Sequence, residues 1–277
     1  MRRVTVLGLG LIGGSIGLAL RERKPELRVV GIDRPEVITR PAAERAAHEL
    51  IEHGDAARVE AALAAELVIL AAPVSVIRQT LARALDRAEV VLDCGSTKRA
   101  ICRSVQGHPR RGQFVPGHPM AGLPDGGIDQ ARADLFEARR WIVCPEQSLP
   151  DALARAEDLI RLLGAQVVHL SADEHDRAVA RTSHVPQLLA SALLTTATSA
   201  GAEPAAGPAF ASATRVAGGP EAMWSDIFAT NADEIAKALG ELLGDLGTVQ
   251  RGLAAEPPAL AAALDLLARA RGIRRSG

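Results

Sequence analysis

Short apolar runs alternate with stretches of helical periodicity through the first 170 residues of the chain. The run at 67–72 is apolar at every position, which is typical of a strand buried on both faces of a parallel sheet. The pattern predicts strands at about 3–8, 28–32, 67–72, 90–93, 140–143 and 166–168, and helices at about 11–20, 41–51, 75–84, 98–105 and 150–163. This alternation indicates an α/β fold with a doubly wound parallel sheet, whose ligand site lies beyond the carboxyl ends of the strands.

The pattern changes after residue 170. Ser171 and Glu174 form a capping box, which predicts a helix that runs through His184 towards Ala200, and everything after it has helical periodicity. We therefore divide the chain into an α/β domain at 1–170 and an all-α domain at 171–277. The stretches at 187–197 and 258–270 carry more Leu and Ala than one small helical core can hide, which predicts a homodimer formed through this domain.

Composition narrows the classes of partner. The 277 residues carry a formal net charge of −1 and no basic run beyond Arg pairs, so we expect neither nucleic-acid nor membrane binding and a small molecule as ligand. The apolar run at 4–20 contains five glycines and no small-residue cleavage site, which favours a cytoplasmic protein over a secreted one. The three cysteines lack metal-ligand spacing, so we expect reduced structural thiols and no metal.

A glycine pattern follows the first expected strand. Gly8, Gly10 and Gly13 have the G-x-G-x-x-G spacing of a Rossmann dinucleotide site, in which they allow a tight turn, close approach of a pyrophosphate and close helix packing. Asp33 directly follows the second expected strand, where a carboxylate accepts from the ribose hydroxyls of NAD. We expect NAD rather than NADP because this carboxylate repels a 2′-phosphate, although the adjacent Arg34 could attract one. The further residues expected to line the cofactor site are Leu11, Ile12, Ala72, Pro73, Ser96 and Lys98.

His118 lies in the loop GHPMAG, directly after a further expected strand that ends at Val115, and on the expected cofactor side. Imidazole is the side chain that accepts a proton near neutral pH, which makes His118 a candidate base. Taken alone, a loop histidine that is hydrogen-bonded to a backbone carbonyl explains the residue equally well.

Six motifs in order along the chain resemble the prephenate and arogenate dehydrogenase family of tyrosine biosynthesis. They are GLGLIGGSIGLAL, AAPVSVI, DCGSTK, GHPMAG, DEHDRAVARTSHVPQLLASAL and FASATRVAGGPEAMWSDIFATN. The resemblance implies NAD-dependent oxidative decarboxylation of prephenate to 4-hydroxyphenylpyruvate, with arogenate, or both compounds, as the alternative substrate. It also implies a dimer formed through the helical domain.

The resemblance implies a role for each matching residue, and each has a structural alternative. His118 draws the proton from the ring hydroxyl and Ser96 orients it, although Ser96 could also cap the following helix. Lys98 steadies cofactor or substrate charge, or is a solvated lysine. Arg215 binds a substrate carboxylate, or forms a packing salt bridge. His184 lines the same pocket, or is a hydrogen-bonded core histidine.

Leu123, Pro124 and Gln187 depart from the family pattern. Many members have a polar or acidic pair after HPMAG and a second histidine where this chain has Gln187. Because no acid at these positions meets an ammonium group, we expect prephenate to be the better substrate, unless Asp125 swings in. Two other functions fit the glycines equally well but not the remaining motif residues. A β-hydroxyacid or imine-type reductase needs a catalytic Lys in the first helix of the second domain, and a non-catalytic NAD sensor needs none of the other motif residues.

Overall fold

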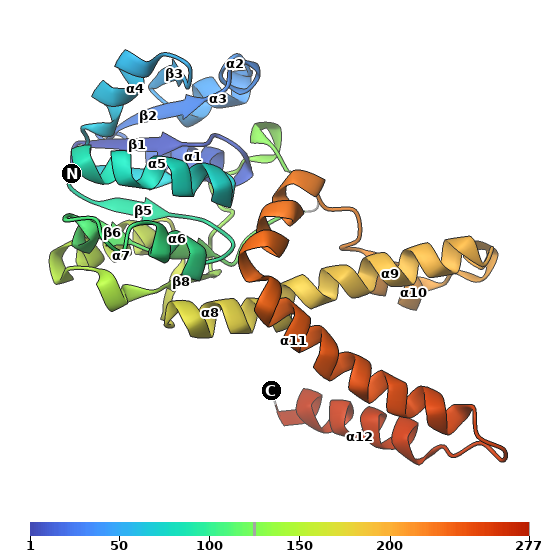
Figure 1. The fold of residues 1–277 in the computed structure, drawn as a ribbon. Helices are drawn as coiled ribbons and strands as arrows, with labels where there is room; N and C mark the ends of the chain where they lie inside the picture. Colours follow the sequence, from blue (N-terminus) through green and yellow to red (C-terminus); the bar gives the residue numbers. More distant parts are fainter. Residues whose placement is uncertain (124–125, 277) are drawn as a thin grey trace.

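The computed structural model describes residues 1–123 and 126–276. An α/β part is followed by a helical part that extends from it as two diverging arms (Figure 1). The main sheet has six strands in the order β3-β2-β1-β4-β5-β6, and all neighbouring pairs are parallel. The strands are β1 (Arg3–Leu7), β2 (Arg28–Asp33), β3 (Glu49–Glu52), β4 (Leu67–Leu70), β5 (Val91–Asp93) and β6 (Phe114–Val115). This topology confirms the doubly wound α/β fold.

Helices cover both faces of the sheet. Alternate residues of each strand point to opposite faces, and so two apolar layers form. On one face Val4, Ile69 and Leu92 pack with residues of α1 (Leu11–Arg23), α3 (Pro41–Ala46) and α7 (Pro150–Leu162). On the other face Val30, Val68 and Val91 pack with residues of α4 (Ala56–Leu63), α5 (Val74–Arg87) and α6 (Arg99–Ser104). A short helix, α2 (Pro35–Ile38), follows β2.

The helix expected at 41–51 is wrong in its second half. α3 ends at Ala46, and Glu49–Glu52 forms the edge strand β3, paired in parallel with residues of β2 from Val30 to Asp33. His48 makes the change of direction, since its amide donates to the carbonyl of Val29 and its Nδ1 accepts from the amide of Val29. Pairing with the sheet therefore outweighs the helical periodicity of these residues.

A second, small sheet follows the main one. Its strands are β7 (Gly117–Pro119), β8 (Arg140–Val143) and β9 (Gln166–His169), with β7 antiparallel and β9 parallel to β8. The strands expected near 140 and 166 therefore exist, but in this separate sheet. Because β7 begins directly after β6, His118 lies on a strand rather than in a loop.

The helical part begins with the expected capping box, in which Ser171 Oγ accepts from the amide of Glu174 and the Glu174 carboxylate accepts from the amide of Ser171. From here to Ser276 every regular element is helical. The helices are α8 (Ala172–Val179), a π-helical turn at Ala180–His184, α9 (Val185–Ser199), α10 (Pro208–Thr214), α11 (Glu221–Leu253) and α12 (Ala261–Ser276). None of the helices within 1–123 and 126–276 is long and apolar enough to cross a membrane.

The two parts meet along α8 and the first half of α11. Asp226 of α11 accepts from the amide and hydroxyl of Ser75, in the first turn of α5, and Thr230 hydrogen-bonds Thr97 after β5. Asp176 of α8 accepts from the amides of Lys98 and Arg99 at the start of α6. The carboxyl ends of β4 and β5 therefore face the helical part.

Candidate active site

The glycines after β1 have separate structural reasons. Gly8 has a φ of +93°, and a Cβ there would lie 2.4 Å from the carbonyl oxygen of Ala71, so the loop before Ala72 and Pro73 packs against it. A Cβ on Gly13 would lie 1.8 Å from the carbonyl oxygen of Gly8. A Cβ on Gly10 would meet nothing within 4 Å. Gly8 and Gly13 are thus needed to pack the turn, whereas Gly10 leaves an open face.

The open face suits a diphosphate. α1 begins at Leu11, next to the half-buried Ile12, and its N-cap residue Gly10 offers no side-chain cap, so the first amides of the helix are available to an anion. Asp33 reaches this turn, since its carboxylate accepts from the amides of Leu9 and Arg34. Arg34 is exposed and its guanidinium lies 3.0 Å from the Glu36 carboxylate.

The motif DCGSTK folds around a buried ion pair. Lys98 Nζ donates to the Asp93 carboxylate and to the carbonyl of Gly117, and both charged side chains are 0 % exposed. The same carboxylate accepts from the amides of Gly95 and Gly117. The solvated alternative for Lys98 is therefore wrong. Its ammonium ties the turn after β5 to the strand that carries His118.

Ser96 lies in this turn and is half-buried, but its hydroxyl hydrogen-bonds no residue in the described ranges. The alternative role as a helix cap is wrong, because Asp176 caps the start of α6 through the amides of Lys98 and Arg99, at 2.7 and 3.0 Å.

His118 stands at the end of a hydrogen-bonded chain. His118 Nδ1 lies 2.8 Å from His175 Nε2, and His175 Nδ1 lies 2.8 Å from a carboxylate oxygen of Asp176. Because a carboxylate only accepts, His175 Nδ1 carries a proton and donates. The Nε2 of neutral His175 then accepts, so His118 donates from Nδ1. Asp176 therefore acts through His175 to fix the proton of His118 on Nδ1. The lone pair on Nε2 of His118 is left free.

The surroundings keep His118 neutral. Burial lowers its pKa well below the usual value, and the nearby His175, Lys98 and His184 lower it further. Burial also lowers the pKa of His175, against the effect of Asp176. Asp176 itself is fully buried, and its hydrogen bonds from His175, Lys98 and Arg99 outweigh its burial and hold its pKa below the usual value. His118 is therefore unprotonated, and able to act as a base, at neutral pH.

His184 closes the same region from the helical part. Its ring is 1 % exposed and stands edge-on to Trp224, and burial lowers its pKa to about 4. Its Nδ1 lies 3.3 Å from the side-chain nitrogen of Asn231, while its Nε2 has no hydrogen-bond partner in 1–123 or 126–276. Gln187 lies one turn further along α9, is 9 % exposed, and likewise makes no side-chain hydrogen bond to those residues.

Arg215 and the loop after GHPMAG lie apart from this cluster. Arg215 directly follows α10, is exposed, and forms no ion pair within the described part of the chain, so no packing salt bridge occupies it there. Leu123 is 37 % exposed. Pro124 and Asp125, which we singled out in the sequence, lie outside the described residues.

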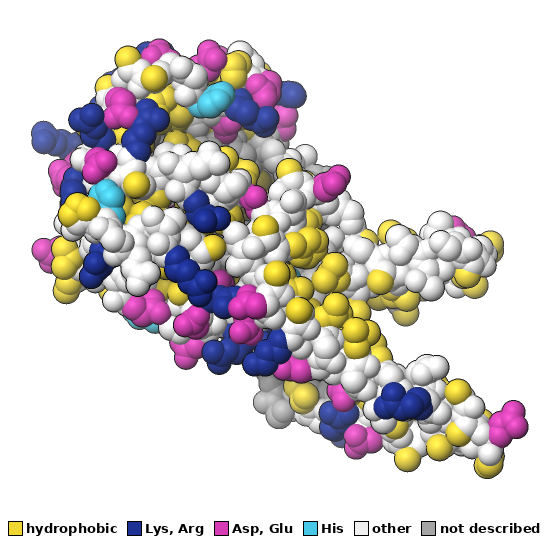
Figure 2. Space-filling model, in the orientation of Figure 1, with side chains coloured by type: hydrophobic (Ala, Val, Ile, Leu, Met, Phe, Trp, Pro, Cys, Tyr) yellow, Lys and Arg dark blue, Asp and Glu magenta, His cyan; other side chains and the backbone are white. Residues whose placement is uncertain are grey.

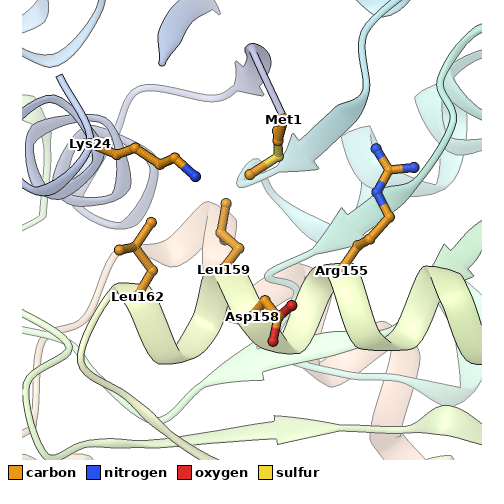
Figure 3. Close-up of a pocket in the computed structure, with 6 residues that line it drawn as sticks. All are labelled: Met1, Lys24, Arg155, Asp158, Leu159 and Leu162. Atoms are coloured by element: carbon orange, nitrogen blue, oxygen red, sulfur yellow. The ribbon is translucent and has the colours of Figure 1, made fainter. Parts of the chain in front are cut away.

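A pocket of about 240 Å³ lies at the other end of the strands from this cluster (Figure 3). Its lining includes Met1, just before β1, and Arg155 and Leu159 of α7. It is therefore at the amino ends of the strands, whereas ligands of open α/β sheets bind beyond the carboxyl ends. Arg155 is also engaged there by Glu89 and by the carbonyl of Glu66.

Sequence reasoning missed three residues of the site: His175, Asp176 and Asn231. The first two stand in the quoted motif DEHDRAV and the third ends FATN, yet we gave none of them a role. The sequence places Asp176 in the first turns of a helix that follows a strand-rich segment. An exposed, solvated acid fits that position equally well. Only the structure indicates a role for this pair, because His175 contacts His118, which lies 57 residues away in sequence.

An α/β sheet with an open glycine turn, joined to helices that enclose a neutral histidine, defines a two-domain nucleotide-dependent oxidoreductase. Two family models match the chain: prephenate dehydrogenase, nucleotide-binding domain, at residues 16–169, and prephenate dehydrogenase, dimerization domain, at 171–258. The chain belongs to the prephenate dehydrogenase family.

Its relatives differ in the substrate that their names give. The prephenate dehydrogenase of Bacillus subtilis is 32 % identical over an alignment of 259 residues, and the match covers 89 % of this chain and 69 % of the relative. The cyclohexadienyl dehydrogenase of Zymomonas mobilis is 29 % identical over 92 % of this chain and 89 % of its own length. The structure of Synechocystis arogenate dehydrogenase has a TM-score of 0.80 and 26 % identity, and the match covers 99 % of each chain.

Proposed function

We propose that this enzyme oxidatively decarboxylates prephenate to 4-hydroxyphenylpyruvate, with NAD as the hydride acceptor. The observation that carries the proposal is the hydrogen-bonded chain from His118 through His175 to Asp176, from which we infer a tautomer of His118 with an unpaired lone pair on Nε2. A free lone pair on a neutral imidazole is what removal of a hydroxyl proton requires. The family membership supplies the substrate class, and the substrate itself is inferred from the residues.

The residues after β1 and β2 fit a bound NAD. Gly10 and the uncapped amides at Leu11 would receive the diphosphate, and Asp33 would accept from the ribose hydroxyls. Ile12, Arg34, Ala72 and Pro73 flank the same turn, and we assign them to this site as well. NAD supplies the acceptor of the hydride from the ring carbinol. Arg34 is engaged by Glu36, which disfavours its use for a 2′-phosphate.

The chain's own residues manage one proton. His118 takes the proton of the ring hydroxyl as the hydride leaves, and Ser96 orders that hydroxyl from the turn after β5. The resulting ketone draws the electrons of the bond to the ring carboxylate, which leaves as CO₂ while the ring becomes aromatic. The oxygen then takes the proton back from His118, so the reaction releases no net proton. His175 and Asp176 hold the imidazole and stabilise its cation.

We assign Lys98 a different part from a direct cofactor contact. Its ammonium already donates to Asp93 and to the carbonyl of Gly117. Lys98 therefore supports the site by holding together the two segments that carry Ser96 and His118. Arg215 is assigned to a substrate carboxylate, since its guanidinium has no ion-pair partner within 1–123 or 126–276. His184 and Gln187 are assigned to the substrate side chain.

We further propose the division into domains at 1–170 and 171–277 and a homodimer formed by the second. Large apolar side chains are exposed on both arms, and Figure 2 shows hydrophobic side chains gathered along α11. Among them are Leu193 at 45 %, Leu243 at 56 %, Leu264 at 60 % and Leu267 at 62 % exposure. Exposed apolar faces of this extent are typical of a surface that another copy covers.

One assay tests the reaction directly. Purified protein is mixed with NAD and prephenate, and NADH is followed by absorbance while the product is identified as 4-hydroxyphenylpyruvate. Formation of NADH with that product supports the proposal. Arogenate is the alternative substrate, and faster turnover of arogenate than of prephenate would replace the proposed substrate. The Ser96→Ala and His118→Asn variants, measured in parallel, locate the reaction at this site.

A further inference from the structure

Asn231 interrupts α11 where that helix crosses the site. Its φ of −137° and ψ of 25° are not helical, and its side chain is completely buried. It contacts three groups from three different elements: Arg99 of α6, the carbonyl of Asp176 in α8, and His184 at the end of the π-helical turn.

The contacts of Asn231 fix which end of its amide faces which partner. The Arg99 guanidinium, 2.8 Å away, can only donate, so the atom that faces it is the amide oxygen. The carbonyl of Asp176, also 2.8 Å away, can only accept, so the amide nitrogen faces it. The second hydrogen of that nitrogen then points to Nδ1 of His184. The chemistry of these partners alone therefore fixes the orientation of the amide.

His184 is consequently held in one tautomer. Its Nδ1 must accept from Asn231, so the single proton of the neutral ring lies on Nε2. This is opposite to His118, whose proton lies on Nδ1. Protonating Nδ1 of His184 would set an N–H against the amide hydrogen of Asn231, and burial also opposes the charge.

We propose that Asn231 is a positioning residue that fixes His184 as a neutral Nε2–H donor, so that the substrate group meeting His184 must be a hydrogen-bond acceptor. A carboxylate or ketone oxygen satisfies this donor, and an ammonium group does not. The tautomer of His184 does not depend on the proposed reaction. The selection of a substrate group with an acceptor atom does rest on the proposed function, and so the tautomer and the selection are tested separately.

The first test is the tautomer of the wild-type protein. Long-range ¹H–¹⁵N correlation spectra of the ¹⁵N-labelled protein without substrate distinguish a protonated Nδ1 from a protonated Nε2, and the His184→Gln variant assigns the signal. We expect the Nε2–H form throughout pH 6 to 9, roughly the range above the His184 pKa of about 4. A protonated Nδ1 in this range overturns the proposal, whatever substrate the enzyme uses.

The second test is Asn231→Asp, which keeps the size of the side chain but replaces the donor with a carboxylate. The carboxylate should draw a proton to Nδ1 of His184 and raise its pKa. The groups around the ring are His175 and Asp176 of α8, Trp224 of α11, and Arg99, which reaches the side chain at 231. Of these, Asp176 raises the pKa of His184 and His175 lowers it.

The variant makes a pH-dependent prediction with a defined sign. Below the raised pKa, the imidazolium of His184 still donates from Nε2, and KM for prephenate stays near the wild-type value. Above it, the remaining proton sits on Nδ1, Nε2 becomes an acceptor, and KM should rise about tenfold to a hundredfold through loss of a hydrogen bond to a charged group. Wild-type KM shows no such titration because His184 is neutral throughout.

Asp233→Asn is the matched control. Asp233 lies on the same helix and binds the same Arg99 guanidinium, but is exposed and does not touch His184. It should leave the His184 signal and the shape of the KM profile unchanged. A rise in KM of Asn231→Asp that is independent of pH would show a structural role only, and overturn the proposal. If Asn231→Asp does not fold, the wild-type spectrum decides the tautomer. If prephenate is not turned over at all, the proposed function fails while the tautomer stands.

Discussion

Replacing His175 by phenylalanine separates the base from the residues that orient it. His175→Phe keeps a ring at a fully buried position but removes the acceptor that lies 2.8 Å from His118 Nδ1. Asp176 keeps its other donors, the amides of Lys98 and Arg99 and the Arg99 guanidinium, so its charge stays paired. We therefore expect the fold to survive and the chemistry to slow.

The size of the effect follows from when the lost hydrogen bond matters. It strengthens when His118 takes the proton and becomes a cation, and a hydrogen bond to a charged group contributes about 1.5 to 3 kcal/mol. At about 1.4 kcal/mol per factor of ten, kcat should fall about 10- to 150-fold. Removing the base itself in His118→Asn should lower kcat by about 10² to 10⁴, and NAD binding should persist.

Steady-state formation of NADH from prephenate measures both variants, with NAD affinity and the thermal midpoint as checks on the fold. His169→Phe is the control, because that histidine is half exposed and pairs with Glu157 instead of the site. Wild-type kcat/KM should be flat through neutral pH and fall only in acid, since burial and the neighbouring His175, Lys98 and His184 keep the pKa of His118 low. Turnover of His175→Phe within twofold of wild type would refute the orienting role of His175.

Four further outcomes are expected. NAD should support faster turnover than NADP, and Asp33→Ala should relax the preference; comparison of kcat/KM for the two cofactors checks this. Arg215→Ala should raise KM for prephenate by about tenfold or more while the NAD dissociation constant is unchanged, because the guanidinium is free to bind a carboxylate. Light scattering should give the mass of a dimer, and Leu264→Glu with Leu267→Glu should shift it towards the monomer if α12 lies in the interface; a wild-type monomer at all concentrations contradicts this. Prephenate should have a higher kcat/KM than arogenate at one pH, and the reverse ratio would show an acid beside the substrate amine.

Patterns among neighbouring residues predicted the fold better than they predicted the site. The glycine turn, the alternating elements and the capping box at Ser171 depend on neighbours in sequence, and each was found. The helix expected at 41–51 failed because strand pairing with β2 is a distant interaction that overrode the local periodicity. His118 was a candidate base from its place after a strand, but its protonation state depends on Asp176, which lies 58 residues further along the sequence. Lys98 could be read as solvated or as ligand-binding, and only the packing of β7 shows its partner.

Two helix caps cross from the helical half of the chain to the α/β half. Asp176 caps α6, and Asp226 binds the first turn of α5, whose N-cap residue Pro73 has no side-chain cap of its own. A helix cap contributes about 1 kcal/mol, so residues 1–170 expressed alone would lose about 2 kcal/mol from these two contacts. The halves are therefore poor modules for exchange. A chimera with the helical half of a relative would need aspartates at both positions for the nucleotide-binding half to keep its stability.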